Sequence, residues 1–169
     1  MIVTERAEVQ CSQICARMLI VFVRYQSPTP GKRGVHTGVF GLINTLGRAG
    51  KLSDQEYRDW RCGNDWFTRT VTDPSDVDPA VYDEHLHPRA TAWFKSDAAH
   101  LLVHLERHLQ ILRNHGVACV RIDSANPGIT IYEDDVQIVV DPLDPRAMTS
   151  YHPSGSLQSE RAGRRAPGV

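Results

Sequence analysis

Apolar residues occupy nearly every position from Leu19 to Tyr25, and Pro28 and the pair Pro30–Gly31 end this run. A short apolar run bounded by turn residues predicts a β-strand that lies inside a sheet. After an intervening loop, apolar positions from Val39 to Leu46 recur with helical spacing. This second segment is therefore expected to be a helix.

A helix start is marked further along by Ser53 and Glu56, which have the spacing of a capping box. The residues that follow place Tyr57, Trp60, Asn64 and Phe67 on one side of the predicted helix. Asn64 is unusual on this apolar side, because a buried amide needs a hydrogen-bond partner. After a loop over residues 73–79, Asp78 and Pro79 predict the start of a short helix that ends near Leu86.

Residues 89–115 have the strongest helical pattern in the chain, and Gly116 supplies the stop. A break near Ser96 is consistent with the sequence, in which case Asp97 would cap a second segment. The apolar face of this helix consists of Phe94, Ala98, Leu101, Leu105, Leu109 and Leu112.

Three strands are predicted after this helix, over residues 117–122, 129–133 and 136–140. Pairing Ile131 with Ile138 and Ile129 with Val140 would place apolar side chains of the last two strands on one face. The order is one strand, three or four helices and then three strands. It predicts an α+β fold with a small, mostly antiparallel sheet and helices packed on one face.

The length of 169 residues favours a single domain, which we place at residues 18–143. Residues 1–17 are expected to be an N-terminal extension, since Met18 opens the first convincing element and either Met1 or Met18 could be the start. Residues 144–169 are rich in Pro, Gly, Ser and Arg without periodicity, so this tail is expected to be disordered.

The formal net charge of −1 hides a strong asymmetry along the chain. Residues 18–53 contain five basic and no acidic residues, whereas residues 54–144 contain eight basic and seventeen acidic ones. The acidic body makes an extended nucleic acid an improbable partner. No apolar run is long enough to span a membrane, and the N-terminus lacks the pattern of a secretory signal. The four cysteines form no pair of C-x-x-C units, so we expect a cytoplasmic protein with reduced thiols.

The basic loop after the first strand is the best candidate site, because glycine turns and a helix start can hold an anion such as a nucleotide or phosphorylated metabolite. Its spacing matches neither the Walker nor the dinucleotide pattern, and a solvated surface loop is the alternative. If the protein is an enzyme, His36 is the best general acid or base. The expected anion contacts are Arg24, Lys32, Arg33, Gly34, His36, Thr37 and Gly38, with Thr37 also able to cap the following helix.

Histidines at helical spacing form a second candidate, a metal site. The expected ligands are Asp97, His100, His104 and His108. Two histidines four positions apart are a known zinc spacing, but half-buried imidazoles also serve as packing residues beside a leucine face. The sequence leaves the identity of any cofactor open. A further alternative is a non-catalytic interaction or regulatory protein that uses the acidic body, the hairpin tip at residues 133–135 and the tail.

Four stretches carry a resemblance to a family: Arg24–Pro28, Asn64–Trp66, Ala92–Lys95 and Tyr132–Asp135. They resemble an uncharacterised family of small proteins from high-GC bacteria, over about residues 18–142. The resemblance implies no activity and no functional residues.

Overall fold

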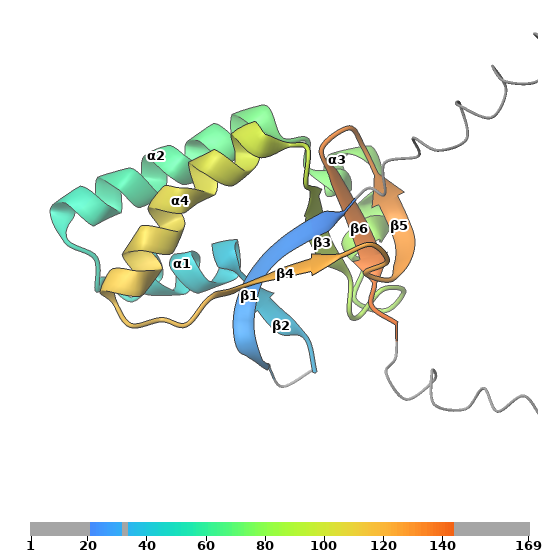
Figure 1. Ribbon diagram of the computed structural model, residues 1–169, viewed down its shortest axis with the longest axis horizontal. Helices are drawn as coiled ribbons and strands as arrows, with labels where there is room; N and C mark the ends of the chain where they lie inside the picture. The colour runs from blue at the N-terminus through green and yellow to red at the C-terminus, as the bar shows by residue number, and fades with distance from the viewer. Residues whose placement is uncertain (1–20, 32–33, 144–169) are drawn as a thin grey trace, which may run out of the picture.

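A computed structural model describes residues 21–31 and 34–143 of the chain. The predicted extension at residues 1–17 and the predicted tail at residues 144–169 lie outside the described residues. Figure 1 shows the longer helices gathered on one side of an antiparallel sheet, which confirms the α+β class. The elements in chain order are β1 (Phe22–Pro30), β2 (His36–Gly38), α1 (Val39–Arg48), α2 (Asp54–Thr70), α3 (Pro74–Val77), the 3₁₀ helix η1 (Pro79–Tyr82), β3 (Thr91–Lys95), α4 (Ala99–Asn114), β4 (Val120–Ser124), β5 (Ile129–Glu133) and β6 (Gln137–Asp141).

Strand β1 lies in the middle of the sheet and uses both of its edges. Phe22 and Val23 pair with both β3 and β4, whereas Gln26 pairs with both β2 and β4. Strand β4 therefore occupies one edge of β1, and β3 and β2 share the other edge one after the other. Beyond β3 the sheet continues through β6 to β5, and every pairing is antiparallel.

Residues 91–95 form a strand, so the predicted single helix over residues 89–115 is wrong in its first part. Neighbouring residues of a strand point to opposite faces. Phe94 accordingly packs against the large core under the helices, while Trp93 joins a second cluster on the other face, with Ile138, Val140 and Phe22. Helix α4 begins at Ala99, just after the expected break. Its N-cap is Ala98 without a side-chain hydrogen bond, so Asp97 does not cap it.

The hairpin of β5 and β6 also differs from the predicted register. Ile138 pairs with Glu133 and Val140 pairs with Thr130, instead of with Ile131 and Ile129. The register shifts between Thr130 and Tyr132, so an extra residue in β5 forms a β-bulge. Because the pairing pattern changes on passing a bulge, a continuous alternation of apolar residues could not give the register.

Smaller corrections concern strands β2 and β4 and the residues between α2 and β3. Strand β2 was not predicted, and β4 begins at Val120, three residues later than expected. The predicted loop at residues 73–79 contains helix α3, and the predicted helix after Asp78 is only the four-residue η1. Asp78 does accept a hydrogen bond from the backbone N–H of Ala80, as expected of its capping role.

The main core lies between the helices and one face of the sheet. Helix α2 starts with the predicted capping box, in which the Ser53 and Glu56 side chains each bond the other's backbone N–H. The leucine face of α4 is buried against α1 and α2, with Leu101, Leu105 and Leu112 wholly inaccessible to solvent. Among the described residues, no helix is both long and apolar enough to cross a membrane.

Candidate ligand-binding cleft

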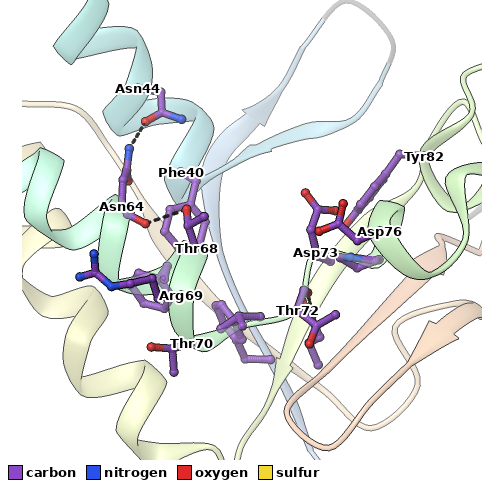
Figure 2. Close-up of a pocket in the computed structure, with 16 residues that line it drawn as sticks. Phe40, Asn44, Asn64, Thr68, Arg69, Thr70, Thr72, Asp73, Asp76 and Tyr82 are labelled. Carbon is purple, nitrogen blue, oxygen red and sulfur yellow. Dashed lines mark hydrogen bonds between the residues drawn. The ribbon is translucent and has the colours of Figure 1, made fainter.

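A cleft of about 700 Å³ opens where the helices, the sheet and the α3–η1 segment meet. Figure 2 shows two facing walls. One wall comes from α1 and the C-terminal part of α2, and the other comes from residues 72–76 and Tyr82. Phe40, Phe67 and Phe94 supply aromatic surface to the lining. Their rings are in contact, with centroids 4.8 Å apart for Phe40 and Phe67 and 6.2 Å apart for Phe67 and Phe94.

A chain of hydrogen bonds runs through the helical wall from Trp60 to His108. The indole N–H of Trp60 donates to Asn44 Oδ1 over 2.9 Å, and Asn64 Nδ2 donates to the same oxygen over 2.8 Å. Asn64 Oδ1 in turn lies 3.2 Å from His108 Nε2. An indole can only donate, so it fixes the orientation of both amides along the chain. Since Asn64 Oδ1 can only accept, Nε2 of His108 carries the proton.

His108 at the end of this chain is wholly buried. Burial lowers the pKa of its imidazole from 6.5 to about 4, so the side chain is neutral at physiological pH. Its other ring nitrogen, Nδ1, has no hydrogen-bond partner among the described residues. The ring lies directly over Gly63, where an added Cβ would be 2.4 Å from the His108 Cε1 atom. Gly63 is therefore the residue that makes room for the imidazole between two helices.

The opposite wall carries negative charge. Asp73, Asp76 and Tyr82 lie together there (Figure 2). Burial and the neighbouring Asp73 raise the pKa of Tyr82 to about 12, so its hydroxyl remains a hydrogen-bond donor. Among the described residues that line the cleft, Arg69 is the one basic residue, and its guanidinium points away from the facing wall. The charge facing the cleft is therefore predominantly negative.

The basic loop predicted from the sequence lies elsewhere, between β1 and β2, and its Arg24 has a structural role. Arg24 donates to the carbonyl oxygens of Ala92 (2.7 Å) and His36 (3.0 Å) and to Gln26 Oε1 (2.8 Å). These bonds join β3 to β2 at the point where the two strands succeed each other along one edge of β1. Burial lowers the pKa of Arg24 to about 10, which still leaves it charged at neutral pH.

The other predicted anion contacts are only partly described. Lys32 and Arg33 lie outside the described residues. His36 Nδ1 is within 2.8 Å of the Ser27 carbonyl, and the Thr37 backbone N–H donates to the Ser27 hydroxyl. The N-cap of α1 is Gly38, and no capping hydrogen bond from a side chain is present at this helix start, so Thr37 does not cap it. Gly34 has a φ of 73°, a conformation that favours glycine in this turn.

The predicted metal ligands do not converge. His104 stacks on Trp66 with ring centroids 3.6 Å apart, while His108 is buried and hydrogen-bonded to Asn64. Asp97 and His100 are exposed. Within residues 21–31 and 34–143, no three His, Cys, Asp or Glu side chains are arranged to hold a metal ion. The histidine spacing in this chain thus reflects packing and exposure on α4.

Sequence reasoning missed the cleft residues Asn44, Asp73, Asp76 and Tyr82. A signal existed for one of them, because Asn44 interrupts the apolar stretch of α1 in the way that Asn64 interrupts that of α2. The amide of Asn64, on the apolar side of its helix, needs hydrogen-bond partners, and Asn44 and His108 supply them. The acidic pair offered no comparable signal, because Asp next to Pro is common in turns and helix caps.

Comparisons with protein-family models, with curated proteins and with solved structures find no match for this chain. The resemblance to an uncharacterised family stays a prediction.

Proposed function

We propose that the protein binds a small organic ligand in the cleft, and that this ligand has a flat apolar body and a positively charged head. The observation that carries the proposal is the combination of a contiguous aromatic lining with two carboxylates on the facing wall. Ligand sites are typically concave, with volumes of about 300–1,000 Å³, largely apolar lining and a few polar groups. The observed volume of about 700 Å³ falls within that range.

Each wall would contribute a different part of the recognition. The rings of Phe40, Phe67 and Phe94 would contact the apolar body, since burial of apolar surface favours binding. Asp73 and Asp76 would pair with a cationic head, and the neutral Tyr82 hydroxyl would donate to an acceptor beside it. The hydrogen-bond chain through Asn44 and Asn64 holds the helical wall in place before a ligand arrives, which lowers the entropy cost of binding.

Three probes that share one ring system and differ in charge test this proposal: naphthylmethylammonium, naphthylmethanol and naphthoate. The full chain is titrated with each probe and binding is monitored through the amide NMR shifts. The affinity should be highest for the ammonium and lowest for the carboxylate. The variant Asp73→Asn/Asp76→Asn should remove the preference for the cation, and asparagine at position 73 can still cap α3.

A matched control is Asp97→Asn/Asp135→Asn, which changes the net charge equally at two exposed residues outside the cleft. This variant should keep the wild-type order of affinities. Equal affinity of the wild-type chain for all three probes, or an unchanged order in the Asp73/Asp76 variant, would reject the proposal.

A second proposal keeps the anion site expected from the sequence, at the loop before α1. It is favoured by the uncapped start of α1, which has no acidic residue in its first turn. Arg24 would act there by positioning β2 and not by direct contact, because its guanidinium already bonds three oxygens. Titration with inorganic phosphate and with a nucleoside monophosphate, monitored by amide NMR shifts, tests this second proposal. Ligand-induced shifts that are the same in the Lys32→Ala/Arg33→Ala variant would exclude the site. The non-catalytic interaction protein stays a prediction.

A further inference from the structure

Strand β4 leaves one of its edges without a strand partner among the described residues. It pairs with β1 over five consecutive positions, from Gln26–Val120 to Phe22–Ser124, without any shift in register. The residues from Val120 to Asp123 are all exposed. An unpaired edge of this kind presents backbone N–H and C=O groups that can pair with another strand.

The other ends of the sheet differ from β4 in this respect. Strand β2 has only three residues, and β5 contains the bulge between Thr130 and Tyr132. Short strands and bulges are the usual ways in which edges are kept from pairing. Strand β4 has a regular register and two exposed β-branched apolar residues on one face, Val120 (37% exposed) and Ile122 (36% exposed).

The charges on the other face of β4 are self-complementary. Arg121 and Asp123 are half-exposed and form an ion pair within the strand, with 2.8 Å between Arg121 Nη2 and Asp123 Oδ1. When two copies of β4 pair antiparallel about a twofold axis at Ile122, each Arg121 lies opposite Asp123 of the other copy. Cross-strand neighbours of opposite charge stabilise such a pair, and the two Ile122 side chains then also lie side by side.

Only one register of the two β4 strands places Arg121 of each copy opposite Asp123 of the other. A twofold axis perpendicular to the sheet leaves the same face of both copies on the same side. Because paired residues of antiparallel strands point to the same face, the axis must lie between the two copies of one and the same residue. An axis at Arg121 would place the two copies of Arg121 opposite each other, and an axis at Asp123 would do the same with the two copies of Asp123. We therefore propose that the protein forms a homodimer through antiparallel pairing of β4 with β4 of a second copy, centred on Ile122 and joining the two sheets into one.

The mass of the full chain in solution is the first test. Sedimentation analysis at about 100 μM, a concentration at which a micromolar complex is almost fully formed, should give the dimer mass. A monomer at that concentration overturns the proposal.

Charge reversal then tests the interface itself. Arg121→Asp and Asp123→Arg each turn two attractive cross-strand pairs into two repulsive ones, so each single variant should raise the dissociation constant about tenfold or more. An equal mixture of the two variants restores opposite charges at every pair and should form a heterodimer. The doubly exchanged variant Arg121→Asp/Asp123→Arg should dimerise as the wild-type chain does.

The mixing experiment separates pairing from damage to the fold, because loss of the ion pair within the strand cannot be repaired by a second chain. Arg107→Asp, which makes the same change of charge at an exposed residue of α4, serves as the control and should leave the dimer intact. A dimer that persists in both single variants, or a mixture that stays monomeric, overturns the proposed interface.

Discussion

Replacement of His108 by glutamine should make the protein less sensitive to mild acid. Burial holds the pKa of the folded imidazole at about 4, against 6.5 for an unperturbed histidine. Between pH 6.5 and pH 4 the imidazole is therefore mostly protonated in the unfolded chain and mostly neutral in the folded chain. The free energy of unfolding is unaffected by this group above pH 6.5, decreases as the pH falls through the window from 6.5 to 4, and reaches its full loss below pH 4.

The size of the effect follows from the difference between the two pKa values. One pKa unit corresponds to about 1.4 kcal/mol, so the complete loss is about 3 kcal/mol. Between pH 7 and pH 5, titration of this one group should lower the free energy of unfolding by about 2 kcal/mol. The amide of a glutamine at position 108 can still donate to Asn64 Oδ1 but does not titrate, so this share of the acid sensitivity should disappear.

Urea unfolding at pH 7, 6 and 5, followed by the fluorescence of the three tryptophans, measures the effect. His108→Gln is expected to be less stable than the wild-type chain at pH 7, because glutamine fills the ring's space poorly. The informative quantity is the change of stability with pH. His100→Gln, at an exposed position of the same helix, should follow the wild-type curve. If His108→Gln loses as much stability between pH 7 and pH 5 as the wild-type chain, the imidazole is not held neutral by burial.

Further predictions concern packing and strand connection. Gly63→Ala should lower the free energy of unfolding by about 2 kcal/mol because its Cβ would meet the buried His108 ring, whereas Gly41→Ala should be neutral or stabilising by up to about 1 kcal/mol because it meets only the methyl group of the exposed Thr37. Equal stability of the two variants in urea would show that the ring can move aside. Arg24→Lys should cost about 2–3 kcal/mol, since an ammonium cannot bond the Ala92 and His36 carbonyls and Gln26 together. Arg121→Lys on the exposed β4 is its control, and a similar loss in both variants would argue against the bridging role of Arg24.

The sequence predicted those features that depend on neighbouring residues. The capping box at Ser53 and the leucine face of α4 depend on spacing within one helix, and both are present. Asn64 was recognised as an amide on an apolar helix side that needs a partner, which the bonds to Asn44 and His108 confirm. Strand β3 was missed because Phe94, Ala98 and Leu101 have helical spacing across the boundary between β3 and α4. Over five residues, that coincidence outweighed the β-propensity of Thr91 and Trp93.

The cleft and the hairpin register depend on segments that are distant in the chain. Asp73 and Tyr82 line the same cleft as Phe40 although they are distant from it in the chain. The bulge in β5 accompanies the pairing of β6 with β3 on its other edge. No local pattern contains these relationships, because they arise when the sheet is assembled. Basic residues in the loop were conspicuous by composition, yet the contacts of Arg24 show that a positive charge can be used to join strands.

The central position of β1 has a consequence for how the chain folds as it leaves the ribosome. Strand β1 is synthesised early, but its partners β3 and β4 come from the second half of the described chain. Among the described residues, only the short β2 is available to pair with β1 before then. Pairing between distant segments is slow, and a nascent strand that waits for its partners leaves apolar residues such as Val23 open to aggregation. Helices α1 and α2 can form during this interval, but the sheet that they cover cannot be completed until β6, which ends at Asp141, has also been synthesised.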